Sequence, residues 1–423
     1  MIKVGIIGVG TVGSHVVKIL QENEDIITAR TGKKIVPIVG VVKNLDKKRD
    51  INIPLTDDVD AVLENPEIDV VIELMGGVDE AYKIVTRALK SKKAVVTANK
   101  ALLAYHRYEL KDLAGDTPVC YEASVAGGIP IIKALREGLS ANHIEALKGI
   151  MNGTCNFILT KMMNEKAEFA DVLKEAQALG YAEADPTFDV GGFDAAHKLL
   201  ILASIAYGID VKPEEILIEG IENINSEDIY FAKEFGYNIK LLTIAKKSGD
   251  KVELRVHPAL VPVHHMIANV DGVMNGISVI GDRVGETMYY GPGAGGSATA
   301  SAVVSDLIDI ARQTQNSPML GFIRPLEKSG LSLMNKEEIE TRYYMRVSVA
   351  DKIGVLSKIS EVLGRHSISI SSFLQKQDSQ KEESAVLLFS THLSKEKNIQ
   401  NALKELSELD FVECKPAMIR IES

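Results

Sequence analysis

A glycine-rich turn near the amino terminus constrains the fold of this chain more than any other feature of the sequence. The segment Gly8-Val-Gly-Thr-Val-Gly13 follows an apolar run and opens an amphipathic stretch, as a turn between a strand and a helix does. In such a unit the first glycine permits the tight turn, the second lets the backbone approach a pyrophosphate, and the third lets the helix pack on the strand. The helix N-terminus then offers unpaired N–H groups to the anion. A structural glycine turn is the alternative, but the pattern favours a dinucleotide site at Gly8, Gly10, Thr11, Val12 and Gly13.

The order of the expected elements predicts an α/β protein of several domains. The first 130 residues alternate β-branched runs with helical stretches, which indicates a Rossmann-type parallel sheet covered on both faces. Residues 131–290 mix helices with a few strands and predict an α+β domain, after which a glycine-rich segment opens the helix Ala298–Thr314. Residues 317–340 have the prolines and charges of a linker, and residues 341–423 follow the order βαββαβ.

The end of the second expected strand bears on the choice of cofactor. An acidic residue usually stands there to bind the ribose 2′-hydroxyl of NAD, but this chain has Lys43, with Lys47, Lys48 and Arg49 close behind. A cation suits the 2′-phosphate of NADP, so Lys43 is predicted to contact the cofactor, and NADP is favoured over NAD. A solvated basic loop without a ligand is the alternative.

Composition and charge disfavour several classes of function. A net charge of −10 and a pI near 5.5 make a nucleic-acid partner a poor expectation. No run approaches the roughly 18 apolar residues of a membrane-spanning helix, so no membrane partner is expected. Cys120, Cys155 and Cys414 lie far apart and lack the spacing of a zinc site or a disulfide framework, which favours the cytoplasm.

Four carboxylates and a lysine gather among glycines and apolar residues near the middle of the chain. Asp194 and Lys198 are four residues apart on an expected helix, so they share a face, and the apolar residues that follow make this face partly buried. A desolvated lysine beside carboxylates is suited to donate a proton. A helix cap with a surface ion pair is the alternative, but the nearby Glu183, Asp185 and Asp189 favour a catalytic site.

Other reactive side chains lack partners that the sequence can place. Cys155 is expected to be a small buried residue and not a nucleophile. His264 and His265 point to opposite faces of a strand, and no third metal ligand is visible. His197 directly precedes the lysine of the cluster and is expected to face away from it.

The segment Ala176–Lys198 resembles the homoserine dehydrogenase motif A-x3-G-aromatic-small-x2-D-P-x2-D-aliphatic-x-G-x-D-x3-K at every position. The segments Gly8–Gly13, Thr97–Leu103 and Met151–Phe157 also resemble that family, so the resemblance covers essentially the whole chain. It implies the reversible reduction of L-aspartate 4-semialdehyde to L-homoserine with NADPH or NADH. That reaction belongs to threonine, methionine and isoleucine biosynthesis.

The resemblance also implies roles for individual residues in catalysis and substrate binding. Lys198 matches the proton donor, Glu183 and Asp194 match the substrate-binding carboxylates, and Asp189 is expected in the same pocket. A hydride arriving at the aldehyde carbon leaves negative charge on oxygen, which Lys198 or a second lysine, Lys100, can neutralise. The substrate carboxylate needs donors, which the Gly153-Thr154 segment can supply, so Thr154 is a candidate; a plain turn is the alternative.

Further cofactor contacts and the domain boundaries follow from the same resemblance. The contacts map to Thr97, Lys100 and Gly180, and Gly295 matches a returning segment that closes over the cofactor. Residues of about 291–316 are therefore expected to join the 1–130 domain, and 131–290 to form the catalytic and oligomerisation domain.

A monovalent cation site is implied as well. Residues 122–129 resemble the place where the family binds sodium through one carboxylate and several backbone carbonyls, which maps to Glu122, Val125, Gly127 and Ile129. Hard oxygen ligands suit such an ion. The residues alone would make Glu122 a buried or capping carboxylate.

Residues 341–423 resemble an ACT domain, a ligand-binding module of amino-acid enzymes. Asp351–Leu356 matches its strand-to-helix turn, where Gly354 lets an amino-acid ligand approach the backbone. The resemblance implies feedback inhibition by threonine and a homodimer or homotetramer; a purely structural tail is the alternative. The linker before the module predicts that it can be removed without loss of folding or activity.

Two other functions stay open at this point. A phosphorylating semialdehyde dehydrogenase would use Cys155 as its nucleophile. A non-catalytic sensor of nucleotide and amino acid would leave the carboxylate and lysine cluster unexplained.

Overall fold

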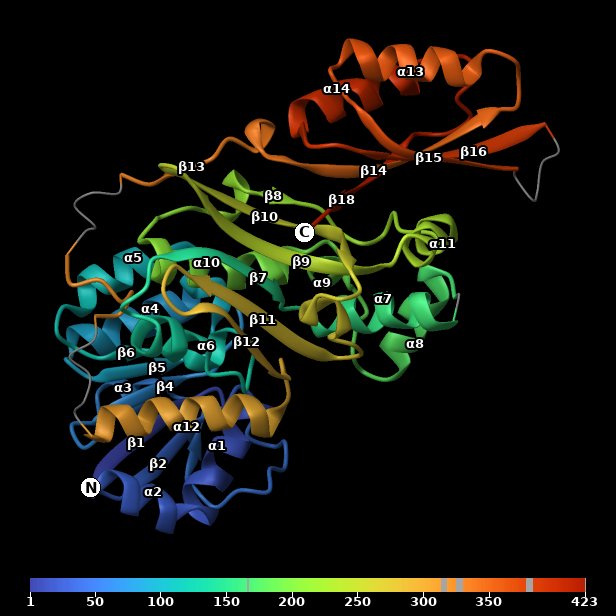
Figure 1. Ribbon diagram of the computed structural model, residues 1–423. Helices are drawn as coiled ribbons and strands as arrows, with labels where there is room; N and C mark the ends of the chain where they lie inside the picture. The colour runs from blue at the N-terminus through green and yellow to red at the C-terminus, as the bar shows by residue number, and fades with distance from the viewer. Residues whose placement is uncertain (166, 313–317, 325–329, 378–382, 423) are drawn as a thin grey trace. The chain divides into compact units, whose positions relative to one another are not determined.

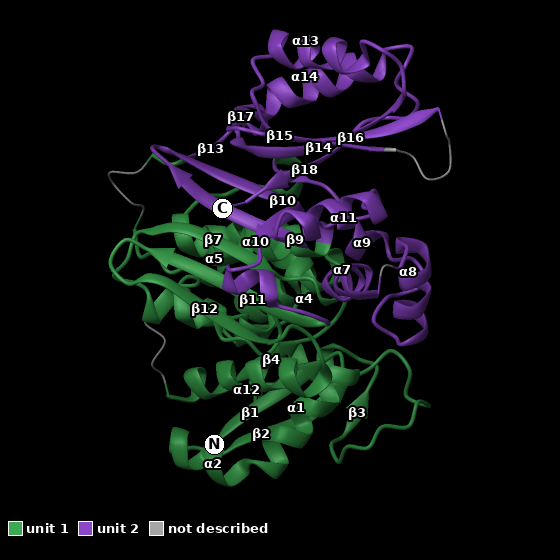
Figure 2. Ribbon diagram, turned by 45° about the vertical axis from the view of Figure 1, so that its right-hand side comes forward, with its two compact units in different colours: residues 1–153, 194–215, 273–331 green, residues 154–193, 216–272, 332–423 purple. Residues whose placement is uncertain are grey.

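The computed structural model of the protein describes residues 1–165, 167–312, 318–324, 330–377 and 383–422. The chain divides into two compact units, coloured green and purple in Figure 2. Unit 1 comprises Met1–Gly153, Asp194–Glu215 and Val273–Leu331, and unit 2 comprises Thr154–Phe193, Ile216–Gly272 and Ser332–Ser423. The predicted 131–290 domain is shared between them, and its boundaries stay a prediction. No helix in the described ranges is long and apolar enough to cross a membrane.

The amino-terminal part of unit 1 is a parallel sheet, as the alternating pattern predicts. Its six strands lie in the order β3-β2-β1-β4-β5-β6. Figure 1 labels β1, β2, β4, β5 and β6, and Figure 2 labels β3. The strands are β1 (Ile2–Ile7), β2 (Ile35–Val41), β3 (Leu55–Thr56), β4 (Val70–Glu73), β5 (Ala94–Thr97) and β6 (Val119–Cys120). Because neighbouring strands are parallel, Ile7, Val41 and Glu73 end side by side at the carboxyl edge, where the glycine turn begins.

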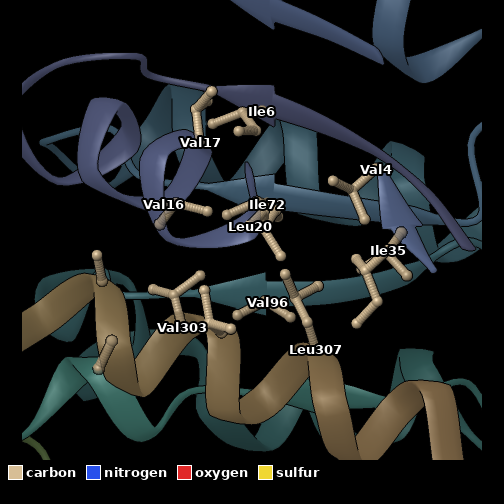
Figure 3. Packing of buried hydrophobic residues seen from close by; sticks show 14 of the residues in the cluster. Val4, Ile6, Val16, Val17, Leu20, Ile35, Ile72, Val96, Val303 and Leu307 are labelled. Atoms are coloured by element: carbon tan, nitrogen blue, oxygen red, sulfur yellow. The ribbon is translucent and has the colours of Figure 1, made fainter. Parts of the chain in front are cut away.

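One face of this sheet is covered by helices from distant parts of the sequence. Val16 of α1 and Val303 and Leu307 of α12 pack with Ile6 and Val96 of the sheet (Figure 3). The helices of this region are α1 (Thr11–Glu22), α2 (Glu24–Thr31), α3 (Asp60–Leu63), α4 (Asp79–Lys90), α5 (Lys100–Ala114) and α12 (Gly296–Arg312). Residues of about 291–316 were expected to join the first domain, and the packing of α12 agrees with this. The last two residues of the helix expected at 298–314 lie outside the described residues.

The rest of unit 1 contains the buried helix α10 and a three-stranded antiparallel ladder. Strand β11 pairs antiparallel with both β7 and β12. The hairpin of β11 and β12 was not predicted, because Gly276, Gly281 and Gly285 interrupt its apolar pattern. The elements are η1 (Glu122–Ser124), α6 (Ile131–Lys133), η2 (Ala134–Gly138), β7 (Ile144–Ile150), α10 (Phe193–Tyr207), η3 (Pro213–Glu215), β11 (Met274–Gly281) and β12 (Gly285–Pro292).

Unit 2 joins a second part of the middle region to the βαββαβ module. Its middle-region elements are α7 (Gly153–Glu165), α8 (Phe169–Ala178), α9 (Thr187–Val190), β8 (Leu217–Ile218), α11 (Ser226–Glu234), β9 (Tyr237–Ser248), β10 (Lys251–Pro262) and η4 (Met266–Asn269). The module and the segment before it contain β13 (Ser332–Leu333), η5 (Lys336–Glu338), β14 (Glu340–Ala350), α13 (Val355–Arg365), β15 (Ile370–Gln377), β16 (Ser384–Thr391), β17 (Ser394–Lys395), α14 (Glu396–Ser407) and β18 (Ala417–Ile421). The expected βαββαβ order is therefore present. Parts of the expected linker, at 317 and 325–329, lie outside the described residues.

The last strand, β18, connects the module to β10. It pairs antiparallel with β14, where Tyr343 is opposite Arg420, and parallel with β10, where Ala259 is opposite Arg420. The sheet of unit 2 thus runs in the order β9-β10-β18-β14-β16-β15 without a break. Removing residues 341–423 would expose the hydrogen-bonding edge of β10 at Ala259 and Leu260, and the expectation of a removable module stays a prediction.

Candidate active site

The cluster of opposite charges predicted on α10 is present in unit 1. The Oδ2 atom of Asp194 accepts hydrogen bonds from Lys198 Nζ at 2.7 Å and from Asn152 Nδ2 at 2.9 Å. The other carboxylate oxygen, Oδ1, lies 3.0 Å from Lys100 Nζ. Lys198 Nζ also donates to the Met151 carbonyl at 2.6 Å. One carboxylate therefore orients two lysines that come from different helices, and Asn152 is a contributor that the sequence analysis did not single out.

The local structure of two helices explains how these side chains meet. Helix α5 begins at Lys100 because the preceding Asn99 caps it, its side chain accepting the N–H of Leu102 at 3.0 Å. Helix α10 is buried along nearly its whole length, as a helix that is apolar on all sides must be. Its first turn carries Asp194, which is 4% exposed, and the next turn carries Lys198, which is 9% exposed. The spacing of four residues puts both groups on one face of the helix.

Electrostatics keep Asp194 ionised. Burial by itself raises the pKa of its carboxyl, but the charges of Lys198 and Lys100, with hydrogen bonds from Lys198 and Asn152, hold the pKa well below its ordinary value. Two lysines around one permanent carboxylate leave these three side chains with a net positive charge. Such a site stabilises negative charge that develops on a nearby oxygen.

The structure corrects the expectation for His197. This residue is 5% exposed, and burial lowers its pKa; the charge of Asp194 opposes this shift, and the charge of Lys100 adds to it. Residues three apart on a helix share a face, so His197 adjoins Asp194 and does not point away from the cluster. The ring also meets that of Tyr105 edge to face, with 5.6 Å between centroids.

The other predicted substrate residues lie in unit 2. Glu183 is exposed and Asp189 is half-buried. Thr154 Oγ1 donates to the carbonyl of Tyr181 at 2.5 Å, and Cys155 Sγ donates to the carbonyl of Asp189 at 3.2 Å. Cys155 is fully buried, in agreement with the small buried residue that was expected. Contact of Glu183, Asp189 and Thr154 with substrate stays a prediction.

A cavity of about 560 Å³ opens at the carboxyl edge of the parallel sheet, and its lining includes Gly8, Gly10, Lys43 and Arg49. Gly8 has a φ of +100°, and a Cβ there would lie 2.6 Å from the Leu74 carbonyl oxygen. A Cβ on Gly10 would meet nothing within 4 Å, so the space beside this residue is open. The cavity therefore lies where the glycine turn predicts a pyrophosphate.

Arg49 is a residue of this cavity that the sequence analysis had included only in a basic run. Its Nε donates to the carbonyl of Val9 in the glycine turn at 2.8 Å, and its Nη1 donates to the carbonyl of Asn44 at 3.0 Å. These bonds place a guanidinium beside Lys43 in the cavity lining. Two cations at this place favour a phosphate more strongly than Lys43 alone.

Thr97 lies beneath the sheet edge and is fully buried, so its hydroxyl does not line this cavity. Its Oγ1 donates to Glu73 Oε2 at 2.6 Å, and the other carboxylate oxygen of Glu73 accepts the N–H of Met75 at 2.7 Å. Burial raises the pKa of Glu73. Thr97 thus holds the end of β4 in place, and any contact with the cofactor stays a prediction, as it does for Lys100 and for Gly180 in unit 2.

The glycines before α12 lie close to the first turn of α1, which Thr11 and Val12 begin. A Cβ on Gly296 would lie 2.6 Å from the His15 ring and 3.1 Å from Thr11 Cγ2. The neighbouring Gly295 has a φ of +118°, a conformation that glycine adopts without strain. The returning segment therefore approaches the glycine turn, as the sequence predicts.

Glu122 caps a short helix in the structure. Its Oε1 and Oε2 accept the N–H groups of Ile132 and Lys133, each at 2.9 Å. The neighbouring Gly127 packs against Gly293, because a Cβ at Gly127 would lie 2.7 Å from that carbonyl. The described residues contain no group of three or more His, Cys, Asp or Glu that could hold a metal. A cation near Glu122 would therefore depend on backbone carbonyls.

Comparison with known proteins assigns the chain to a family. The homoserine dehydrogenase family matches residues 130–308, the NAD-binding domain of homoserine dehydrogenase matches residues 8–120, and the ACT domain matches residues 343–411. A homoserine dehydrogenase from Helicobacter pylori is 56% identical over 422 residues, which are 100% of this chain and 99% of the relative. One from Pseudomonas aeruginosa is 45% identical and is covered to 99%, again with 100% of this chain.

Solved structures agree with this assignment. The crystal structure of a homoserine dehydrogenase from Thiobacillus denitrificans matches with a TM-score of 0.94 and 46% identity, covering 100% of this chain and 98% of its own. A hyperthermophilic archaeal homoserine dehydrogenase in complex with NADPH matches with a TM-score of 0.63 and 28% identity, covering 73% of this chain and 97% of its own. The chain therefore belongs to the homoserine dehydrogenase family and is an NAD(P)-dependent oxidoreductase with a carboxyl-terminal ACT domain.

Proposed function

We propose that Lys198 is the proton donor in the reversible reduction of aspartate 4-semialdehyde to homoserine, and that Asp194 orients it. The observation that carries this proposal is the buried pairing of Lys198 with Asp194, at 2.7 Å, beside Lys100. The nicotinamide, when bound, supplies the hydride. Lys198 then gives a proton to the aldehyde oxygen, and Lys100 provides a second positive charge for the same oxygen. In the reverse direction the amine of Lys198 accepts the proton of the homoserine hydroxyl.

Glu183, Asp189 and Thr154 are the other proposed substrate-binding residues. Glu183 and Asp189 provide negative charge for the substrate ammonium, and Thr154 provides a donor for its carboxylate. This part of the proposal rests on the family motif, which these residues match, and on the chemistry of the substrate. A rise in KM for homoserine without a change in KM for the cofactor in Glu183→Gln and Asp189→Asn would support it.

NADP is the proposed preferred cofactor, and Lys43 and Arg49 are its proposed contacts. Both cations line the cavity beside the glycine turn, and the archaeal relative described above was solved with NADPH. A guanidinium and an ammonium suit the dianionic 2′-phosphate, which NAD lacks. Steady-state rates with NADPH and NADH test this choice, and equal kcat/KM values would contradict it.

A monovalent cation, sodium, is the proposed occupant of the loop of Glu122, Val125, Gly127 and Ile129. One carboxylate and three carbonyls are the hard oxygen ligands that such an ion takes. Burial raises the pKa of Glu122 to about 7, with the charge of Asp306 adding to the effect. A bound cation would favour the ionised carboxylate in these buried surroundings.

The ACT domain is proposed to bind threonine as a feedback inhibitor, with Gly354 at the ligand-binding turn. Gly354 has a φ of +89° and is the N-cap of α13, and a turn of this kind can bring a ligand close to the backbone. We further propose a homodimer or homotetramer, which light scattering would establish, and a cytoplasmic location, for which the cysteine spacing is the argument. Inhibition assays with threonine and other amino acids test the effector.

A further inference from the structure

A buried arginine of the ACT domain contacts the middle region within unit 2. Arg420 lies on β18 and is fully buried. Its Nη1 and Nη2 donate to Oε2 and Oε1 of Glu219 at 2.6 and 2.9 Å, a bidentate pair. Its Nε and Nη2 also donate to Glu396, at 2.9 and 2.6 Å. One guanidinium therefore joins a carboxylate of the middle region to one at the start of α14.

The ACT side of this contact is connected to the core of the module. Glu396 is the first residue of α14, it is 4% exposed, and it also accepts the hydroxyl of Tyr343 at 2.9 Å. Helix α14 packs on α13 through Ile399 and Ile359, which share one buried cluster. Gly354 is the N-cap residue that directly precedes helix α13. A ligand that moves the start of α13 therefore acts on the helix that holds Glu396.

The other side of the contact leads to the segment that carries Asp189. Glu219 follows β8, and its N–H bonds to the Val256 carbonyl of β10 at 2.8 Å. Two residues later, the N–H of Ile221 bonds to the carbonyl of Val190 at 2.9 Å. A Cβ on Gly192 would lie 3.3 Å from the Glu219 carbonyl oxygen. The backbone at 219–221 is thus packed directly on residues 190–192, which end the segment beginning at Glu183.

We propose that Arg420 and Glu219 are positioning residues that set the geometry of the 183–192 segment from the ACT domain. Neither touches substrate; the pair holds residues 219–221, and these hold Val190–Gly192. The charges are complementary and the pair is bidentate, so its geometry is more restricted than that of a single lysine–carboxylate contact. The inference rests on the proposed role of Glu183 and Asp189 in substrate binding, and it adds the route by which an effector would reach them.

The decisive variant is Glu219→Gln in the full-length enzyme. The Glu219 side chain is 35% exposed, so the substitution removes its charge without leaving a fully buried hole. Glu338→Gln is the matched control, because Glu338 also pairs with a cation of the middle region, Lys251 Nζ at 2.5 Å, but from the segment before the ACT domain and on the exposed surface. We expect Glu219→Gln to raise KM for homoserine about fivefold or more, the lower end of typical coupling between sites, with kcat and KM for the cofactor little changed. Glu338→Gln should match the wild type.

Two further readouts separate positioning from a loss of stability. Hydrogen exchange of peptides spanning 183–192 should be faster in Glu219→Gln, while peptides of α5 in unit 1 exchange as in the wild type. Calorimetry should show that the variant still binds threonine, although inhibition has weakened. If Glu219→Gln does not fold, Arg420→Lys takes its place, since lysine keeps the charge but not the bidentate geometry.

The outcomes distinguish the inference from the proposed function. An unchanged KM together with unchanged exchange at 183–192 overturns the inference. If no amino acid inhibits the wild type, the proposed effector is wrong, while KM and hydrogen exchange still decide the positioning role. If Glu183→Gln leaves KM for homoserine unchanged, the proposed substrate role fails, and exchange at 183–192 alone decides whether the pair orders that segment.

Discussion

Replacing Lys198 by methionine tests the assignment of the proton donor most directly. Methionine has a similar length and fills the space without a charge. Transfer of a proton by a positioned side chain contributes about 10²–10⁴-fold to rate. At ~1.4 kcal/mol per tenfold, this corresponds to roughly 3–5 kcal/mol of transition-state stabilisation. We expect kcat to fall by that factor.

Stability should fall less than the loss of a buried ion pair usually implies. An uncompensated buried charge destabilises a fold by ~3–5 kcal/mol. In Lys198→Met, however, Asp194 keeps Lys100 at 3.0 Å and Asn152 at 2.9 Å, so its charge remains paired. The variant should therefore fold, with its loss in free energy of unfolding below that range. Lys198 does not line the 560 Å³ cavity, so the affinity of this variant for NADPH should stay within a few-fold of the wild type.

The assay follows cofactor absorbance, with thermal unfolding and NADPH titration as controls. Lys100→Met is the matched comparison, because it removes the other cation of Asp194 and leaves Lys198 in place; its loss in kcat should be smaller. A shorter variant, Lys198→Ala, leaves room for an added primary amine, which should restore part of the rate there but not in Lys198→Met. A near-normal kcat in Lys198→Met, or a larger loss in Lys100→Met, would refute the assignment.

Four further changes have defined outcomes. Lys43→Asp should lower the preference for NADPH over NADH by about tenfold, because a hydrogen bond to a charged group contributes ~1.5–3 kcal/mol. An unchanged ratio of the kcat/KM values for the two cofactors would place Lys43 outside the ribose site. Sodium chloride should raise the Tm of the wild type above its value in choline chloride of equal ionic strength. The variant Glu122→Gln should show no such difference between the two salts. An equal effect of sodium on both proteins would contradict the proposed sodium site. Gly354→Val should weaken inhibition by threonine and leave kcat without effector unchanged. Valine at a φ of +89° is strained, and its side chain obstructs the ligand-binding turn. Titration with threonine measures the loss of inhibition. Burial raises the pKa of Glu73, so its ionisation opposes folding as the pH rises above the ordinary value of 4.5. The Tm of Glu73→Gln should therefore gain on that of the wild type as the pH rises above this value, and a difference that stays constant with pH would contradict the reasoning.

Local patterns were sufficient for much of the fold. The parallel sheet, the glycine turn and the βαββαβ order were predicted because each depends on residues close together in the chain, through side-chain periodicity and turn chemistry. The pairing of Asp194 with Lys198 was predicted for the same reason, since a helix places residues four apart on one face. His197 was misjudged because residues three apart share that face too.

Other features depended on partners that lie far away in the sequence. The hairpin of β11 and β12 was missed because glycines interrupt its pattern, and its partner strand β7 lies more than 120 residues away in the sequence. Arg49 was hidden in a run of basic residues until its bond to the Val9 carbonyl placed it in the cavity.

The sequence by itself determined the family, the cofactor class and the spacing of the catalytic cluster, because a motif and a helical repeat are local properties of the chain. Only the tertiary structure decided that Lys100 and Lys198 share one carboxylate and that β18 joins the ACT domain to β10. Strand pairing and buried ion pairs select partners by shape and charge across long separations in sequence. Their outcome depends on the packing of the whole unit and is not contained in any one segment.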